Sequence, residues 1–323
     1  MMPRAGVDYP ATWQAFEAWF GDESACRRYL ARLRWPEGFV CPRCSGGAAW
    51  ETGRGLWMCR SCAYQASVTA GTIFHRSRLP LSDWFAAIWF LCSQKNGVSA
   101  LGLQRVLGFG PYETAWAWLH KLRRAMVRPD RDGLGGPGVA VEMDATFIGG
   151  RSKVRLGVGR YQNKAEVLIA VERRHPRGLG RARLGLIDSA DRRAQTLSFA
   201  QESVAPASVL YTDGDKLYND LAERVGVTHE RIVLLRRADP AHELLPAVHR
   251  VASLLKRWLA GTLHDGQSTE HLAYYLDEFT FRFNRRTSRS RGLLFYRLLQ
   301  QALNTDPHPL HEITAPLPRS VTT

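Results

Sequence analysis

The elements predicted along the second half of this 323-residue sequence follow the order expected of an α/β domain. From residue 139 onward, segments with strand or helix periodicity alternate as strand, strand, strand, helix, strand, helix, strand and helix. Two observations describe what precedes this domain. Cysteines form two CxxC pairs within residues 41–62, and residues 81–126 have helical periodicity throughout. We therefore expect an α/β domain preceded by a cysteine-rich module and a helical region.

The first strand of the α/β domain lies in VAVEMDATFIGG, residues 139–150, where strand periodicity ends at a Gly-Gly pair. The remaining elements are predicted in chain order: a basic hairpin in SKVRLGVGRYQNK, strands in KAEVLIAVERR and RARLGLIDSA, a helix in RRAQTLSFAQESV, a strand in SVLYTDGDKLY, a helix in LYNDLAERVG, a strand in RIVLLRR and a helix in PAVHRVASLLKRWLAG. Further helices are expected in STEHLAYYLDEFTFRFNRR and RGLLFYRLLQQAL. Residues 127–138 are rich in Gly, Pro and charge and are expected to form a linker.

The charge of the chain indicates a polyanionic partner. Lysine and arginine number 44 against 30 aspartates and glutamates, which gives a formal net charge of +14. Such an excess is typical of proteins that bind DNA or RNA, although a basic protein without this function is the alternative. No apolar run approaches the length of a membrane span, and the N-terminus lacks a signal-peptide core. We expect a cytoplasmic, nucleoid-associated protein with no membrane partner.

Four of the six cysteines have the spacing of a structural zinc site. Cys41 and Cys44 form one CxxC turn, and Cys59 and Cys62 form the second. In a reducing compartment, two such turns supply four thiolates to one tetrahedral Zn²⁺. A closed shell of four thiolates leaves no open position, so this zinc is expected to stabilise the fold rather than to catalyse a reaction.

The helical segments in residues 81–126 predict a helix-turn-helix. Breaks at Asn96-Gly97 and at residues 108–111 divide the region into three helices. Ser99 is a candidate N-cap of the second helix, and Pro111 suits the first turn of the third. On the third helix, the candidates for DNA contact are Tyr112, Glu113, Thr114, His120, Lys121, Arg123 and Arg124. The alternative is a three-helix bundle with a solvated basic end.

Two aspartates at strand positions are candidates for a metal site. Asp144 lies within the first strand, where a buried charge is costly unless a cation or a hydrogen-bond donor compensates it. Asp213 ends the strand VLYTDG, and carboxyl ends of strands face the crevice in which open α/β sheets bind ligands. Asp144 and Asp213 could hold two cations that act on a phosphodiester.

A third site residue is expected on the helix that begins at Pro246. His249, Ser253 and Lys256 fall on one stripe of this helix, whereas its apolar residues fall on another. Glu243 is the nearest alternative carboxylate, but it precedes Pro246 and lies off this stripe. We therefore expect His249 to complete the site.

With these motifs, the sequence resembles the bacterial insertion-sequence transposases that have an N-terminal zinc ribbon and an RNase H-like DDE catalytic domain. The resemblance covers nearly the whole chain. It is carried by RWPEGFVCPRC, TAGTIFHRSRLPLSDWF, VEMDATFIGG, YTDG, HRVASLLKRWLAGTLHDGQS and YLDEFTFRFNRR. The resemblance implies an RNase H-like fold with a mixed five-stranded sheet. The expected regions are N-terminal helices (1–37), a zinc ribbon (38–78), a helix-turn-helix-like region (79–128), the catalytic domain (139–285) and a C-terminal helix and tail (286–323).

The resemblance also implies a function and a set of catalytic residues. A chain of this kind is expected to bind the terminal inverted repeats of an insertion sequence as a homodimer or higher oligomer, to cleave the DNA strands and to join them to target DNA. Asp144, Asp213 and His249, with Lys256, match the catalytic positions of the family. They imply two Mg²⁺ or Mn²⁺ ions per active site, beside the structural Zn²⁺. His249 replaces the more usual glutamate and is a poorer partner for Mg²⁺.

Two other functions remain open from the sequence. The replacement at His249 is compatible with a catalytically impaired, transposase-derived zinc-ribbon protein that binds DNA. An RNase H-like nuclease or resolvase would share the two aspartates but would not require a module that binds element ends.

Overall fold

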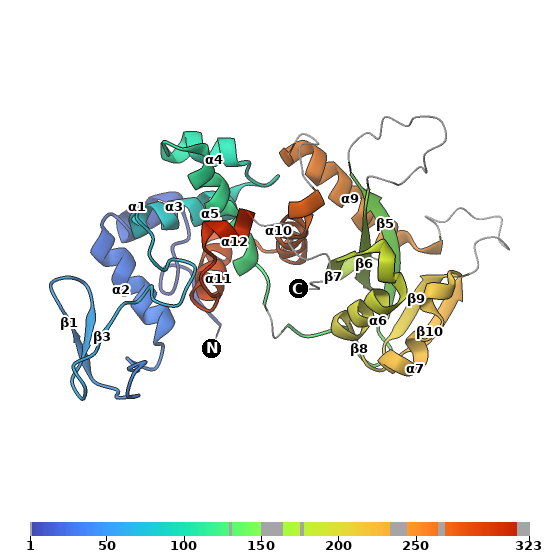
Figure 1. Cartoon of the computed structure of the whole chain (residues 1–323), viewed down its shortest axis with the longest axis horizontal. Coiled ribbons are helices and arrows are strands. Elements are labelled where there is room, and N and C mark those ends of the chain that lie inside the picture. The colour runs from blue at the N-terminus through green and yellow to red at the C-terminus, as the bar shows by residue number, and fades with distance from the viewer. Residues whose placement is uncertain are drawn as a thin grey trace. The chain divides into compact units, whose positions relative to one another are not determined.

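A computed structural model describes residues 2–128, 131–149, 164–174, 178–232, 244–263 and 269–314 of the chain. The chain forms two compact units, one built from Met1–Val127 together with Thr287–Ala315 and the other from Arg128–Arg286. Figure 1 shows the helices and strands of both units.

The first unit contains a small sheet and two groups of helices. The antiparallel strands β1 (Ala49–Glu51), β2 (Trp57–Cys59) and β3 (Gln65–Ala66) form the sheet. The helices are α1 (Trp13–Trp19), α2 (Glu23–Arg34), α3 (Leu81–Ser93), α4 (Ala100–Leu107), α5 (Tyr112–Ala125), α11 (Arg291–Leu303) and α12 (Leu310–Thr314). The expected N-cap is present, because the Ser99 hydroxyl accepts a hydrogen bond from the Gly102 N–H at 3.1 Å. Gly108 ends α4 in the left-handed conformation, which glycine adopts without strain.

Helix α11, from the C-terminal part of the chain, belongs to the core of this first unit. Phe295 of α11 is fully buried and makes edge-to-face ring contacts with Phe16 and Phe85 and a tilted contact with Phe20. Gly292 allows this close approach, since a Cβ atom there would lie 1.8 Å from the Pro10 carbonyl oxygen. The beginning and the end of the chain therefore fold together.

The second unit is the α/β domain expected from the sequence. Its mixed sheet has the strand order β10-β9-β5-β6-β7. The strands are β5 (Ala140–Ile148), β6 (Ala165–Arg173), β7 (Leu179–Ile187), β9 (Val209–Asp213) and β10 (Thr228–Ile232). β6 is antiparallel to β5 and β7, whereas β9 is parallel to β5 and β10. The prediction of a mixed five-stranded RNase H-like sheet is confirmed.

Helices cover both faces of this sheet (Figure 1). Apolar residues of α9 (Pro246–Leu263) and α10 (Leu272–Asn284) pack on one face with the side chains of Ile148 and Ile169. α6 (Arg192–Ser203) and α7 (Leu221–Val225) pack on the other face with Val141 and Met143. Because side chains alternate along a strand, Glu142 and Asp144 share the α9 face with Ile148.

Three segments of this unit differ from their predicted structure or lie partly outside the described residues. Residues 131–138 are not a free linker, since β4 (Leu134–Gly135) pairs with β8 (Val204–Ala205) and Leu134 is fully buried. The last strand begins at Thr228, earlier than predicted, because its edge position allows polar residues that break the apolar pattern. The predicted basic hairpin at 152–164, apart from Lys164, and residues 233–237 of the predicted fifth strand lie outside the described residues.

Candidate functional site

The strand register brings the two candidate aspartates together. β5 and β9 are parallel neighbours, and their register pairs Glu142 with Tyr211. The pairing of β5 with β9 ends at these two residues. Asp144 and Asp213 follow two residues later on their strands, and alternation places both on the same face of the sheet. The charge of Asp213 raises the pKa of Asp144, so the two carboxylates lie near each other.

The electrostatics of Asp144 reflect these neighbours. Burial raises the pKa of its carboxyl group to about 6, and the negative charges of Asp213, Asp215 and Glu166 act in the same direction. The Ala145 N–H, which donates to Asp144 Oδ1 at 2.7 Å, partly opposes this rise. A divalent cation would relieve the repulsion among these carboxylates, so the donor set fits Mg²⁺ or Mn²⁺.

Asp215 and Glu166 were not among the residues that the sequence analysis selected. Asp215 follows Asp213 in the turn after β9, and its own N–H donates to Asp213 Oδ1 at 3.0 Å. Glu166 on β6 accepts a hydrogen bond from Arg192 Nε at 2.8 Å. The sequence signal for Asp215 was its position beside Asp213. Glu166 gave none, because it pairs with Phe147 on the α6 face of the sheet and acts on Asp144 only through its charge.

Helix α9 carries the expected third residue. Val248, Val251 and Leu255 of α9 are buried against the sheet, whereas His249 is half-buried and Lys256 is exposed. Partial burial of the Lys256 ammonium group and the nearby charge of Lys164 lower the pKa of Lys256. The other candidate for the third position, Glu243, lies outside the described residues.

His249 lines a cavity of about 700 Å³ at the start of α9. Arg173, Arg174 and Arg250 line the same cavity and make it predominantly basic. Within the described ranges, the four cysteines are the one group of three or more His, Cys, Asp or Glu residues whose ligand atoms lie within 4.8 Å of one another. The ligand atoms of Asp144, Asp213 and His249 therefore do not all lie within 4.8 Å of one another.

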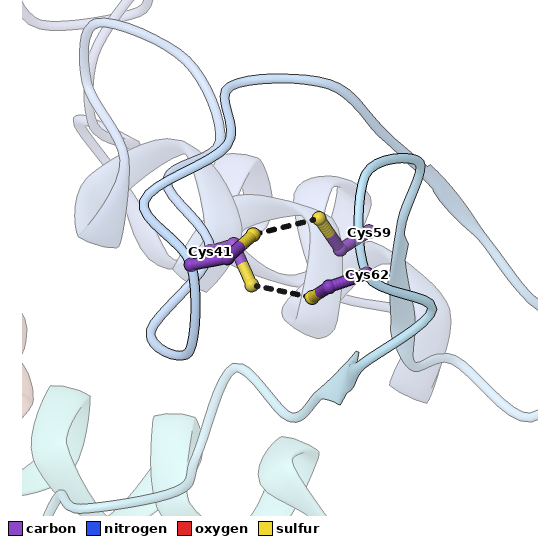
Figure 2. Close-up of side chains that lie close together, drawn as sticks. Cys41, Cys59 and Cys62 are labelled. Carbon is purple, nitrogen blue, oxygen red and sulfur yellow. Dashed lines mark hydrogen bonds between the residues drawn. The ribbon is translucent and has the colours of Figure 1, made fainter.

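The four cysteines have the geometry of a zinc site. Their sulfur atoms all lie within 4.8 Å of one another, with Cys41 Sγ 3.7 Å from Cys62 Sγ and Cys44 Sγ 3.6 Å from Cys59 Sγ. A tetrahedral zinc with Zn–S bonds of about 2.3 Å requires sulfurs about 3.8 Å apart. Figure 2 shows the side chains of Cys41, Cys59 and Cys62 converging from two loops. The distances and the donor set fit a structural Zn²⁺.

The loops affect the cysteines unequally. Although the Gly46 N–H opposes the change, hydrogen bonds to the neighbouring thiols and burial raise the pKa of Cys44 to about 12, whereas the pKa of Cys59 is lowered. Burial opposes ionisation of Cys59, but the backbone N–H groups of Cys62 and Ser61, together with hydrogen bonds from the side chains of Cys44 and Cys41, lower the pKa of Cys59 to about 6. Each CxxC turn contains one further turn bond, from Ser45 N–H to the Cys41 carbonyl and from Ala63 N–H to the Cys59 carbonyl. The loops thus hold the sulfurs in place by local backbone geometry.

The structure separates the predicted DNA-contact residues of α5 into two groups. Tyr112 and Glu113 are exposed and Thr114 is half-buried at the N-terminal end, which is the part of a recognition helix that reaches base edges. His120 and Arg123 are 0% and 2% exposed, so neither is available to a DNA phosphate. The expectation that Arg123 contacts DNA is wrong, because the C-terminal half of α5 packs inside the first unit. Lys121 and Arg124 are half-buried, so part of each side chain remains exposed to solvent.

Both regions match models of known families. Residues 134–284 match the model of the ISXO2-like transposase domain, and residues 21–65 match the model of the transposase zinc-ribbon domain. Together the two matches span more than half of the chain. The chain belongs to the ISXO2-like transposases. All four cysteines lie within the zinc-ribbon match, and Asp144, Asp213 and His249 lie within the other.

One curated relative of this ISXO2-like transposase is an uncharacterized protein in transposable element ISH50 of Halobacterium salinarum. The two are 26% identical over 294 residues, which covers 81% of this chain and 91% of the relative. Because the relative is archaeal, it supports the insertion-sequence family but not the bacterial origin that we expected.

A solved structure, described as a simian T-cell lymphotropic virus intasome in complex with PP2A regulatory subunit B56 gamma, is 13% identical with a TM-score of 0.29. The similarity covers 69% of this chain and 76% of that one, and at this score it supports no argument. No helix within the described ranges of the transposase is both long and apolar enough to cross a membrane.

The zinc site of the transposase leads to a prediction about metal content. Purified protein should contain one zinc per chain by elemental analysis, and Cys59→Ser should lose it because three thiolates do not close the shell. Cys26→Ser, at a buried cysteine outside the cluster, is the control and should retain the metal. Zinc-free wild-type protein, or full zinc in Cys59→Ser, would contradict the assignment.

The burial difference along α5 leads to a second prediction. The affinity for DNA falls as the salt concentration rises. Arg124→Gln should make the slope of log affinity against log salt concentration shallower by about one, because one phosphate contact is removed. The neighbouring variant Arg123→Gln should lower the melting temperature and leave the slope unchanged. Binding titrations over a range of salt concentrations measure both. An unchanged slope for Arg124→Gln, or a shallower slope for Arg123→Gln alone, would reject this arrangement.

Proposed function

We propose that this ISXO2-like transposase binds the ends of its insertion sequence and catalyses metal-dependent DNA strand cleavage followed by strand transfer. The observation that carries the proposal is the pair of carboxylates, Asp144 and Asp213, which lie on neighbouring parallel strands and interact through their charges. The raised pKa of Asp144, caused by burial and by neighbouring carboxylates, supports the presence of a cation in the working enzyme.

Asp144 and Asp213 would hold Mg²⁺ or Mn²⁺ through carboxylate oxygens, the donors that these hard cations prefer. When bound, two such cations activate the attacking oxygen and stabilise the leaving oxygen of a phosphodiester. The nucleophile is water in the cleavage step and the freed 3′-hydroxyl in the transfer step. In each step one P–O bond forms as another breaks.

The residues around the carboxylates have complementary tasks in this proposal. His249 either ligates the cation through a neutral ring nitrogen or, when protonated, donates to the phosphate. The positive charges of Arg173, Arg174 and Arg250 favour entry of the DNA backbone into the cavity beside α9. Lys256 adds a further cation on the polar stripe of α9.

Recognition of the element ends is assigned to the first unit. The N-terminal residues of α5, Tyr112 and Thr114, would contact bases, and Lys121 and Arg124 would contact phosphates of double-stranded DNA. The zinc ribbon would add contacts outside the helices. Because an element has two ends, we expect at least two copies of the chain to assemble on DNA before transfer.

The proposal predicts that both aspartates are required for catalysis and not for DNA binding. Asp144→Asn and Asp213→Asn should each slow cleavage of a terminal-repeat duplex by at least about 10³-fold, because an amide binds the cations poorly. Affinity for the same duplex without divalent cations should not fall. Asp220→Asn, at an exposed carboxylate paired with Arg193, is the control. Cleavage by either active-site variant at the wild-type rate would refute the proposed site.

A separate prediction concerns the third residue. His249→Ala should slow Mg²⁺-dependent cleavage by about 10²-fold or more, whereas His249→Glu should keep or raise it. Ser253→Ala, on the same stripe, should have a smaller effect than His249→Ala. If Glu243→Ala is inactive while His249→Ala is active, the third position belongs to Glu243.

A further inference from the structure

Between Leu244 and the start of α9, the described residues offer no side chain that caps the first N–H groups of the helix. Pro246, its first residue, has no N–H, and the preceding residue, Leu245, is a buried apolar side chain that accepts no hydrogen bond. The first intrahelical bond runs from the His249 N–H to the Leu245 carbonyl at 3.3 Å. The N–H groups of Ala247 and Val248 therefore need an acceptor from elsewhere in the protein.

Glu142 of β5 is that acceptor. Its Oε2 atom accepts from the Ala247 N–H at 2.7 Å and from the Val248 N–H at 3.0 Å. The side chain is fully buried, and its other oxygen lies 3.4 Å from Arg173 Nε. A buried carboxylate is costly, and burial raises the pKa of Glu142, but the positive end of a helix and an arginine partly offset that cost.

This contact joins the two parts of the candidate active site. Glu142 lies two residues before Asp144 on β5, and the capped Val248 directly precedes His249 on α9. The contact bridges more than a hundred residues of sequence and lines the cavity that contains His249. A shift of α9 along its own axis would move His249 and Lys256 relative to Asp144.

Apolar packing alone fixes this axial position poorly. The stripe of Val248, Val251 and Leu255 determines which face of α9 meets the sheet, but hydrophobic burial is non-directional. Two hydrogen bonds to one oxygen are directional and tolerate displacements of only a few tenths of an ångström. Glu142 is therefore the contact best suited to set the position of His249 along β5.

We infer that Glu142 is a positioning residue of the active site, which fixes the N-terminus of α9 to the catalytic strand and thereby sets His249 against Asp144. The inference rests on the proposed function. It assigns to Glu142 no contact with the DNA or with the reacting atoms.

Three substitutions distinguish the effect of the position of the Glu142 oxygen from the effect of its negative charge. Glu142→Gln keeps an oxygen at the same reach and loses the charge. Glu142→Asp keeps the charge, but its carboxylate is withdrawn by about 1.5 Å. Glu142→Ala removes both. Glu172→Ala is the matched control, since Glu172 is also a largely buried, ion-paired glutamate of this unit, but it accepts hydrogen bonds from Gly135 and Arg181 rather than from α9.

The first readout is independent of activity. Hydrogen exchange in the metal-free, DNA-free protein should show faster exchange of a peptide covering residues 244–252 in Glu142→Ala and Glu142→Asp. Glu142→Gln and Glu172→Ala should retain most of the wild-type protection. Unchanged protection in Glu142→Ala would overturn the inference.

The second readout is cleavage of a terminal-repeat duplex at a temperature where each variant is folded. Glu142→Ala should lower kcat by about 100-fold, the usual effect of a displacement near 1 Å, with KM for DNA within about threefold of wild type. It should also raise the Mg²⁺ concentration needed for half-maximal rate. Glu142→Gln should recover at least a tenth of the wild-type kcat and exceed Glu142→Asp, and Glu172→Ala should stay within about threefold of wild type.

Three results would overturn the inference. In the first, Glu142→Asp is at least as active as Glu142→Gln. In the second, Glu142→Ala is folded and keeps nearly the wild-type kcat, and in the third, Glu142→Ala and Glu172→Ala lose the same activity at equal stability. If Glu142→Ala does not fold, the comparison of Gln with Asp decides. Failure of the proposed function is distinguishable, because it would appear as a wild-type protein that does not cleave the duplex, or as an active Asp144→Asn, whatever the Glu142 variants do.

Discussion

The α/β unit depends on how its central strand accommodates buried carboxylates. β5 lies in the middle of the sheet with helices on both faces, yet it carries Glu142 and Asp144 on one side. Two helix N–H groups and an arginine partly compensate the first, although burial still raises its pKa. The protein gives the second a single N–H and surrounds it with like charges. The same strand thus contains one carboxylate that stabilises the fold and one that is suited to a cation.

In the first unit, a glutamate from a distant segment also caps a helix. Helix α3 follows Pro80, which offers no side-chain cap, and the N–H groups of Leu81 and Ser82 donate to Glu23 Oε2 at 2.7 and 3.3 Å. In both units a glutamate from a distant segment caps a helix that has a proline at its start. Each helix is therefore positioned by a tertiary contact rather than by its own sequence. This arrangement suits a protein in which a helix must present one residue to a site built on another element.

The sequence predicted the features that depend on local spacing. The CxxC pairs predicted the four-sulfur cluster, and the alternation around Asp144 predicted β5. Features set by tertiary pairing were not predicted. Arg123 has the helical position of a surface cation, but α5 buries it, and residues 131–138 have a linker composition but pair with β8. The role of Glu142 was missed for the same reason, because its partners lie 105 and 106 residues away.

The central claim is that Asp144 and Asp213 share a divalent cation at the edge where β5 and β9 separate. The most direct measurement is anomalous diffraction at the manganese edge from crystals of the transposase grown with Mn²⁺. The account predicts a peak within about 2.2 Å of a carboxylate oxygen of both Asp144 and Asp213, in keeping with oxygen ligation of a hard cation. A manganese ion bound by Glu166 and Asp215 without Asp144, or no peak near β5 at saturating Mn²⁺, would contradict it.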